Sequence, residues 1–465
     1  MANDSTVNES AQGGEHGPGL KKVMGPKMLL FFVVGDIIGT TIYALTGKIA
    51  GKVGGALWLP FLVAFVVAFL TAFSYLELVG KYPKAGGAPL YIHRAFGMHF
   101  LTFMVAFAVM CSGITSASSG AQAFSGDYLQ EIAPGAPSWL VGVAFIVLIA
   151  LVNLRGVAES AKLNVVLTVI LLAGMALVIV PGALAIFGVT TNDQLVPDPS
   201  RLLEFNADTG PFMAVTSATA LAFFAMVGFE DTVNMAEETK DPIKTFPRAV
   251  LKGLAITAAI YMIIAVISST LVPTNELADS DGPLLLVVQT AAPWFPPILF
   301  AVMALFALSN TALINMMMAS RLLYGMAQEK VIPRGFGLVH HTRQTPWVSI
   351  LFTSILAVIL ISSLDIEDLG NTTSLLLLVV FAMVNVAVLV LRREKVEHDH
   401  FRAPTWVPVL GAITCAFFAS PLAGRPVEEY VVAAILLAIG VVFWAVNYFA
   451  GGRHKTEFDP TKLGS

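Results

Sequence analysis

An acidic residue lies beside glycine and hydroxyl-bearing residues near the start of the chain, inside a strongly apolar stretch. Asp36 is followed closely by Gly39 and by the pair Thr40-Thr41. A charged carboxylate at the middle of a bilayer costs a few kcal/mol or more unless it is paired or hydrated. Asp36 is therefore a candidate for binding a proton or a cation. The alternative is a carboxyl group that only ties broken backbone N–H groups together.

A second apolar stretch, residues 211–237, has the same character. Gly228, Glu230 and Asp231 follow the apolar run Phe223–Val227. Glu230 is a second candidate for proton binding or gating, and the alternative is a hydrogen-bonded brace between helices. Both stretches predict interrupted helices, because irregular backbone survives in a membrane only where it lines a buried or wet cavity.

The composition of the chain is that of a membrane protein. Of its 465 residues, 56% are apolar and 12% are charged, whereas soluble proteins have about 25% charged residues. This excludes a cytosolic enzyme, a nucleic-acid-binding protein and a disordered scaffold. The net charge of −4 offers no basic face to a polyanion, and the eight histidines and two cysteines lack metal-ligand or disulfide spacing. We therefore expect no nucleic acid partner, no metal and no cofactor.

Twelve apolar runs are candidates for membrane helices, since a bilayer core of about 30 Å needs roughly 20 residues per helix. The runs are continuously apolar, unlike the alternating strands of a membrane barrel. Only four of the 27 Lys and Arg residues, Lys48, Lys52, Arg201 and Arg425, fall on the side opposite the N-terminus. This asymmetry predicts a multi-pass protein of the cell membrane with both termini cytoplasmic. The predicted spans are Met28–Lys48, Trp58–Gly80, Gly97–Asp127, Trp139–Leu154, Leu163–Val189, Pro211–Glu237, Leu254–Val272, Pro297–Met318, Val348–Leu364, Ser374–Leu391, Trp406–Ala419 and Tyr430–Phe449.

The two interrupted spans are the first and the sixth, so corresponding features are five helices apart. This spacing predicts two inverted five-helix repeats with a binding site between them. A broken helix exposes N–H groups that attract a carboxylate and carbonyl groups that attract an ammonium. A zwitterionic amino acid or a related amine would fit both. The predicted segments are a disordered cytoplasmic tail (1–26), a single transmembrane domain (27–451) with repeats 28–189 and 211–391 and two last helices (404–451), and a cytoplasmic tail (452–465).

Four groups of motifs occur in order along most of the chain. They are Gly39-Thr40-Thr41-Ile42-Tyr43; Tyr82-Pro83-Lys84-Ala85-Gly86-Gly87 with Tyr91 and Arg94; Gly228-Phe229-Glu230 with Glu237-Glu238-Thr239-Lys240-Asp241-Pro242 and Pro247-Arg248-Ala249; and Ser320–Ala327. Together they resemble the motifs of the amino acid–polyamine–organocation superfamily of secondary transporters. The resemblance implies an all-α membrane protein of twelve transmembrane helices, with the LeuT-like five-plus-five inverted repeat and discontinuous helices 1 and 6.

The resemblance also implies where the substrate binds. In relatives the unwound part of helix 1 binds the substrate carboxylate, and unwound helix 6 receives its amine next to a gating aromatic residue, here Phe224. Glu230 falls where relatives keep a glutamate tied to proton sensing, so Glu230 and Asp36 are the predicted coupling or gating residues. The predicted substrate-binding residues are Asp36, Ile38, Gly39, Thr40, Thr41, Ser116, Phe224, Ala225, Val227 and Gly228.

Other polar residues in the spans have two interpretations. Ser116 belongs to a stripe of polar residues on one face of the third span, and Ser309, Asn310 and Asn315 lie in the eighth. Such residues line a solute path or let helices pack closely. We also expect Glu77 to be an anchor at the membrane interface, and residues 237–248 to form a cytoplasmic loop that caps the sixth span.

Two residues depart from the family pattern. Thr41 stands where the motif usually ends in a second glycine, and an acid such as Asp36 is less usual at its position. The leading interpretation is secondary active transport of an amino acid by alternating access, coupled to a proton or another cation. A polyamine or other organic amine is the alternative cargo. A passive channel or an amine-sensing receptor is the alternative from another class, whereas the intramembrane protease motifs Gly-x-Gly-Asp and Gly-x-Ser-Gly are absent.

Overall fold

The computed structural model describes residues 25–83, 86–155, 160–189, 195–235, 239–341, 343, 345–396 and 398–451. Within these ranges the chain forms α-helices and short 3-10 helices and contains no β-strand, so the predicted all-α class is confirmed. The predicted tails up to residue 24 and from residue 452 lie outside the described residues. So do the motif residues Lys84, Ala85, Glu237 and Glu238.

The described part of the chain contains ten helical segments that are long and apolar enough to cross a membrane. Two shorter apolar helices, α15 (Trp347–Ser363) and α17 (Trp406–Ala419), coincide with the predicted ninth and eleventh spans and have 17 and 14 residues. The number of crossings, twelve, stays a prediction. The uninterrupted long helices are α4 (Trp58–Lys81), α6 (His99–Ser125), α8 (Ser138–Arg155), α9 (Ser160–Ile186), α11 (Pro242–Leu271), α14 (Pro297–Gln328), α16 (Ile366–Leu391) and α18 (Val427–Gly451).

The first and sixth spans are interrupted where the sequence predicts. Helix α1 (Pro26–Ile37) ends two residues before Gly39, and the chain resumes as α2 (Thr40–Ala44) and α3 (Thr46–Val53). Helix α10 (Gly210–Ala222) gives way to two 3-10 helices, η2 (Phe223–Met226) and η3 (Asp231–Met235). Gly228, between η2 and η3, has a φ of +124°, a conformation that residues with a β-carbon rarely adopt.

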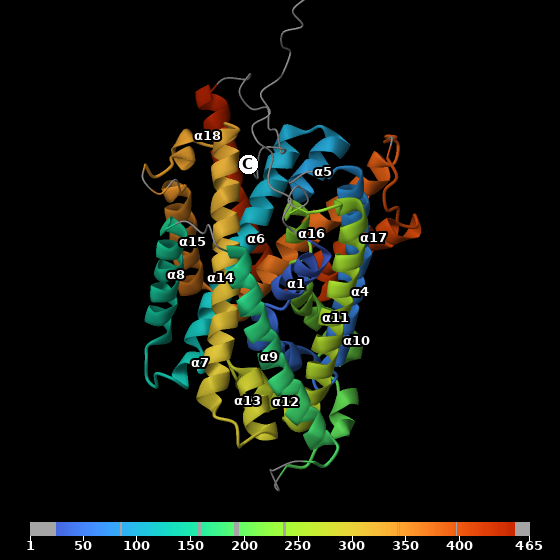
Figure 1. Cartoon of the computed structure of the whole chain (residues 1–465), viewed down its shortest axis with the longest axis vertical. Helices are drawn as coiled ribbons and strands as arrows, with labels where there is room; N and C mark the ends of the chain where they lie inside the picture. The colour runs from blue at the N-terminus through green and yellow to red at the C-terminus, as the bar shows by residue number, and fades with distance from the viewer. Residues whose placement is uncertain are drawn as a thin grey trace, which may run out of the picture.

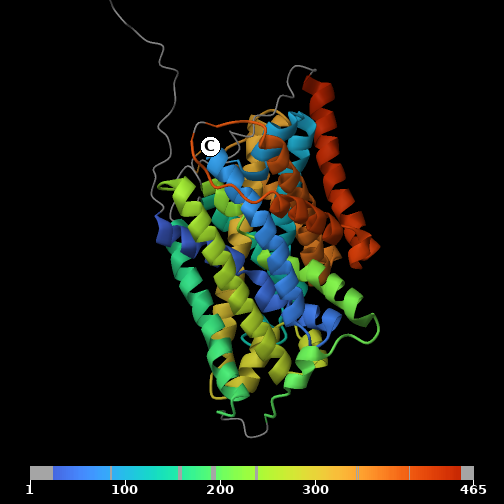
Figure 2. The ribbon, with the colours of Figure 1, turned by 90° about the vertical axis from the view of Figure 1, so that its right-hand side faces the viewer.

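The long helices form one elongated bundle (Figure 1). Helix α5 (Gly87–Phe96) lies toward the upper end in that view, and the short helices α12 (Thr274–Asp279) and α13 (Pro283–Ala291) lie at the lower end. Helix α1 packs against α9 and α11, whereas α6 packs against α14 and α16. The last helix, α18, lies at the edge of the bundle (Figure 2). The two interrupted spans are therefore held in the interior, with uninterrupted helices around them.

Two expectations about charged segments are wrong. Residues 242–248 are not a loop but the first two turns of α11. Pro242 suits the first position of this helix, because the N–H of a residue there makes no intrahelical hydrogen bond and its absence costs nothing. Glu77 is not an interface anchor, because its side chain is 3% exposed and pairs with Arg392 at 2.7 Å. The tenth span also starts earlier than predicted, at Ile366, since the Asp365 carboxylate accepts the N–H of Asp368 and caps α16.

Candidate functional site

The two interruptions touch each other. A β-carbon placed on Gly228 would lie 3.0 Å from the carbonyl carbon and oxygen of Asp36 and from the nitrogen of Ile37. These are backbone atoms at the end of α1, which cannot rotate away as a side chain can. The positive φ of Gly228 and this contact both require glycine at the position. The chain between η2 and η3 is thus fitted directly against the end of α1.

Two neighbouring residues, Tyr261 and Thr168, hold the end of α1 in place. The Tyr261 hydroxyl, from α11, donates a hydrogen bond to the Ile37 carbonyl at 2.8 Å. This partner replaces the intrahelical one that the last carbonyls of a helix lack. Gly35 packs so closely on α9 that a β-carbon there would lie 2.1 Å from the Thr168 Oγ1. The carbonyl end of α1 therefore has a defined position in the interior.

Aromatic residues surround the chain that follows the first interruption. The Tyr128 hydroxyl donates to the Tyr43 carbonyl at 2.7 Å, and the Tyr43 hydroxyl donates to the Leu171 carbonyl at 3.3 Å. The rings of Tyr43, Tyr128 and Phe300 lie 6.2–6.4 Å apart between centroids, and all three side chains are buried. This cluster fills the interior on the side toward α12 and α13.

A carboxylate supports the second interruption. The Gly228 N–H donates to Glu230 Oε2 at 2.8 Å, and the Asp231 N–H donates to the Gly228 carbonyl at 3.1 Å. Glu230 is 8% exposed. A hydrogen bond from a backbone N–H to an ionised acceptor is roughly twice as strong as one between neutral groups. The shape of this segment thus depends on a side chain that can gain or lose a proton.

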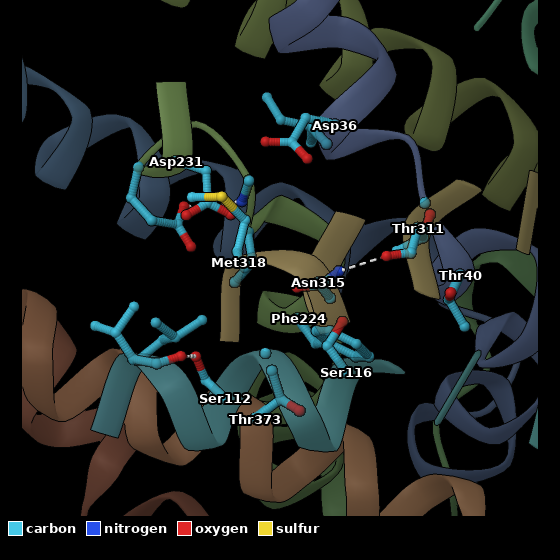
Figure 3. A pocket seen from close by; sticks show the side chains of 18 of the residues that line it. Asp36, Thr40, Ser112, Ser116, Phe224, Asp231, Thr311, Asn315, Met318 and Thr373 are labelled. Carbon is cyan, nitrogen blue, oxygen red and sulfur yellow. Dashed lines mark hydrogen bonds between the residues drawn. The ribbon is translucent and has the colours of Figure 1, made fainter. Parts of the chain in front are cut away.

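Both interruptions line one cavity, together with α6, α14 and α16 (Figure 3). Three carboxylates face it, those of Asp36, Glu230 and Asp231, and the described lining contains no Lys, Arg or His. The other polar lining residues are Thr40, Thr41, Ser112, Ser116, Thr311, Asn315 and Thr373. The cavity combines backbone groups at helix ends, acidic side chains and hydroxyl groups, which suits a small polar ligand with a positive charge.

Two polar atoms of the lining have no hydrogen-bond partner within the described part of the chain. They are Asp36 Oδ2 and Thr40 Oγ1, and each is buried. Most buried polar atoms in proteins are paired, and an unpaired one costs about 1–3 kcal/mol. The lining therefore presents hydrogen-bonding groups, one on each side of the first interruption, that a ligand could use.

Comparison with known proteins identifies the family of this chain. Residues 28–423 match the family model described as amino acid permease. The chain belongs to the amino acid permease family. It is therefore a multi-pass membrane transporter and not an enzyme, as the motif resemblance implies, and its family lies within the amino acid–polyamine–organocation superfamily.

The relatives of this permease match it along most of their length. The branched-chain amino acid permease BcaP of Bacillus subtilis is 26% identical over 463 residues, 95% of each chain. The methylthioribose transporter of Bacillus subtilis is 25% identical and is covered over 90% of its length. The low-affinity putrescine importer PlaP of Escherichia coli is 26% identical over 80% of this chain and 81% of its own.

The structure of the permease brings most of the predicted site residues together. Two of them, Ile38 and Ala225, are buried but do not line the cavity, so any role of theirs would rest on their backbone groups. The role of the whole set in binding stays a prediction. The predicted residues that line the cavity are Asp36, Gly39, Thr40, Thr41, Ser116, Phe224, Val227, Gly228 and Glu230.

Several lining residues were not predicted as site residues. Asp231 follows the predicted Glu230 directly, and Thr373 comes from α16. In α14, Thr311 and Met318 line the cavity. So does Asn315, for which the sequence left both lining and helix packing open, whereas Ser309 and Asn310 do not. The separations of four and three residues place Thr311, Asn315 and Met318 on one helix face, but the sequence alone does not show that this face meets a cavity.

Proposed function

We propose that this permease moves an amino acid across the membrane by alternating access to the cavity, with coupled movement of a proton. The observation that carries the proposal is the contact between the two interruptions at Gly228 and Asp36. It brings the interrupted backbone of two broken helices to one cavity, which is the arrangement that binds substrates in transporters with discontinuous helices.

The substrate carboxylate would bind at the start of α2. The first N–H groups of a helix have no intrahelical partners and carry a partial positive charge. Gly39 precedes α2 and has no side-chain cap, and the unpaired hydroxyl of Thr40 lies beside it. Thr41 and Ser116 add hydroxyl groups to the same lining.

The substrate ammonium would bind at the second interruption. The carbonyl groups between Phe224 and Val227 leave the regular helix there, and Val227 has an extended backbone. The three carboxylates of the cavity add negative charge around this end. Phe224 would cover the bound substrate, since its side chain lines the cavity that the two interruptions share (Figure 3).

The proton would be carried by the carboxyl groups that face the cavity. Asp36 has an unpaired oxygen, whereas Glu230 accepts the Gly228 N–H. Protonation of Glu230 removes the charge from that hydrogen bond and weakens the support of the second interruption. Proton binding and the shape of the substrate site would be coupled in this way.

The structure supports one half of an alternating-access cycle. The cavity is small, about 50 Å³, so its walls must separate to admit an amino acid. Its lining extends from the interruptions to Met318 and Leu322, in the part of α14 that lies far from α13, while the buried aromatic residues Tyr43 and Tyr128 fill the opposite side. We propose that the cavity opens toward the α5 end in this state and toward the α12 end in the other.

We also propose the membrane topology expected from the sequence. It has twelve crossings, counting α15 and α17, two inverted repeats (28–189 and 211–391), and both termini on the cytoplasmic side of the cell membrane. The short helices support the inversion, because α5 follows the second span and α12–α13 follow the seventh, at opposite ends of the bundle (Figure 1).

A second candidate function is the transport of a cationic amine. Three carboxylates face the cavity, and the described lining has no basic side chain to balance them. A diamine would neutralise more of this charge than a zwitterionic amino acid. The relative PlaP is named as a putrescine importer, which supports this candidate, whereas BcaP is named as a branched-chain amino acid permease.

The test is uptake into liposomes that contain the purified protein, with and without an imposed pH gradient. The twenty amino acids and putrescine are offered as radiolabelled substrates. We expect accumulation of at least one of them above its equilibrium level, driven by the gradient. Accumulation of putrescine alone would favour the second candidate, equilibration without accumulation would indicate a channel, and the absence of any uptake would contradict the proposal.

The role of Asp36 is tested in the same assay with Asp36→Asn. We expect the variant to exchange substrate across the membrane but to lose accumulation driven by the pH gradient. Asp208→Asn is the control, because Asp208 is exposed between η1 (Pro199–Leu203) and α10. A variant at Asp36 that accumulates substrate like the wild type would exclude this carboxyl from coupling.

A further inference from the structure

A buried arginine lies where the last two helices of the chain meet the transport core. Arg425 is located between η5 (Pro421–Ala423) and α18, and its side chain is 1% exposed. Its guanidinium donates to the Glu429 carboxylate at 2.7 Å, and the Glu429 side chain is also 1% exposed. Burial lowers the pKa of the Arg425 guanidinium, and the charge of Glu429 opposes that shift.

All five N–H donors of Arg425 are used. Besides the bond to Glu429, Nε donates to the Phe418 carbonyl at 2.6 Å and Nη1 donates to the Asn371 carbonyl at 3.1 Å. Nη2 donates to Ser374 Oγ at 2.9 Å and to the Ala220 carbonyl at 3.4 Å. The acceptors belong to four helices: α10, α16, α17 and α18. A lysine could not reproduce this set, because its ammonium has three donors.

Two of these acceptors adjoin the walls of the cavity. Ala220 is in the last turn of α10, just before η2 begins, and Phe224 of η2 lines the cavity. Ser374 follows Thr373, which also lines the cavity. The Ser374 hydroxyl itself donates to the Ala220 carbonyl, so Arg425, Ser374 and Ala220 form one connected group.

The starts of η2 and α16 are also packed closely. A β-carbon on Gly370 would lie 3.2 Å from Phe224 Cδ1 and 3.1 Å from Leu221 Cδ1. A small change in the distance between α10 and α16 would therefore move the ring of Phe224. Arg425 bridges the same two helices, since it donates to the Ala220 carbonyl of α10 and to the Asn371 carbonyl of α16.

Stability alone is a poor explanation for the Arg425–Glu429 pair. Taking two charges out of water is costly, and apolar residues of similar size often give equal or greater stability in place of such a pair. The geometry at Arg425 instead fixes directions and distances, because a planar guanidinium binds its acceptors in one arrangement.

We propose that Arg425 is a positioning residue of the transport site. It fixes the end of α10 relative to the start of α16, and so sets the positions of Phe224 and Thr373 at the substrate. The last two helices of the chain would thereby contribute to substrate affinity without touching the substrate. This inference rests on the proposed transport function.

A second arginine provides a matched comparison at the other end of α16. Arg392 pairs with Glu77, with Nε to Oε1 at 2.8 Å and Nη2 to Oε2 at 2.7 Å. Its other acceptors are the Ala403 carbonyl and Thr405 Oγ1. None of these partners lines the cavity in the described structure, so this pair can be disturbed without moving the walls of the site.

The experiment compares Arg425→Lys with Arg392→Lys in proteoliposomes. KM and maximal rate are measured with the radiolabelled amino acid, or putrescine, that the wild type accumulates in the uptake assay, and the melting temperature is measured separately. We expect Arg425→Lys to raise KM about tenfold, a loss of one order of magnitude in affinity. Arg392→Lys should lower the melting temperature by a similar amount but leave KM within about twofold of the wild type. Equal effects of the two variants on KM, or an unchanged KM in Arg425→Lys, would overturn the proposal.

A milder variant covers the case in which Arg425→Lys does not fold. Ser374→Ala removes one acceptor of Arg425 and the donor to Ala220 and leaves the ion pair with Glu429 in place. We expect KM to rise about threefold or more with little change in melting temperature, and an unchanged KM would overturn the inference. A wild-type protein without any uptake would contradict the proposed function instead, so the two failures are distinguishable.

Discussion

Substitution of Gly228 by alanine perturbs the contact between the two interruptions with the smallest possible change. The added β-carbon would lie 3.0 Å from three backbone atoms of Asp36 and Ile37, and φ would have to stay at +124°. A strained backbone conformation of this kind costs about 1–3 kcal/mol. Overpacking against backbone atoms, which cannot rotate away, adds about 1 kcal/mol, a value at the lower end of the range measured for overpacked cores.

The total cost of about 2–4 kcal/mol is relieved when η2 and the end of α1 move apart. The variant should therefore populate conformations in which the two halves of the substrate site are separated. Since each 1.4 kcal/mol changes an equilibrium tenfold, we expect the affinity for substrate to fall at least about 30-fold.

The assay is substrate uptake in proteoliposomes, with binding measured separately as the substrate-induced rise in melting temperature. Gly97→Ala is the matched control, because Gly97 has a φ of +65° but no atom within 4 Å of the added β-carbon. It carries backbone strain without the contact and should transport like the wild type. Wild-type affinity in Gly228→Ala, or an equal loss of affinity in Gly97→Ala, would show that the contact of Gly228 with Asp36 and Ile37 does not shape the substrate site.

Three further substitutions test individual groups of the site. Thr40→Val removes the unpaired hydroxyl with little change in shape, so the melting temperature should stay the same or rise. Substrate affinity should fall about tenfold, because one hydrogen bond to a charged group is lost. An unchanged affinity in a binding titration would exclude this hydroxyl from the site. Tyr261→Phe removes the donor to the Ile37 carbonyl and should cost about 1–3 kcal/mol, measured as a lower melting temperature; wild-type stability would mean that this bond does not support the end of α1. Glu230→Gln keeps an acceptor for the Gly228 N–H but removes the charge. Substrate uptake should become insensitive to the pH gradient, while substrate exchange across the membrane persists. Gradient-driven uptake at the wild-type level would assign proton coupling to another residue.

The interruptions themselves could be predicted from local sequence. Glycine, acidic and hydroxyl residues at the middle of an apolar span disfavour a continuous lipid-facing helix, and the end of α1 just before Gly39 agrees with that reasoning. The direct contact of Gly228 with Asp36 could not be predicted, because it joins residues far apart in the chain and depends on how all the helices pack.

The polar lining was only partly predictable for a physical reason. A threonine hydroxyl in a helix commonly binds the carbonyl of the preceding turn, as Thr311 does with Ala307 at 3.3 Å and Thr373 does with Leu369 at 2.9 Å. The sequence therefore does not distinguish threonines that face a cavity from those that face a neighbouring helix. Asn315 and Asn310 show the same difficulty, since one lines the cavity and the other is buried away from it.

Charged residues near helix ends were the least predictable. Glu77 lies near the end of α4, where the sequence favours an anchor at the membrane surface, and Arg392 directly follows α16. They form an ion pair inside the protein because α4 and α16 end side by side. The Lys81 ammonium, at the end of α4, donates to the carbonyls of Leu391 and Glu394, at and just after the end of α16. Arg425 and Glu429 are likewise buried by helices that the local sequence does not specify.

A structure of the protein with a transported substrate bound would show directly whether the two interruptions form the substrate site. We predict that the substrate lies between them, with one end at the backbone of Gly39–Thr41 and the other at Phe224–Gly228. Substrate bound in another place, for example in the hollow near Lys48 and Glu367, would contradict this prediction. Contact of the substrate with only one of the two interruptions would also contradict it.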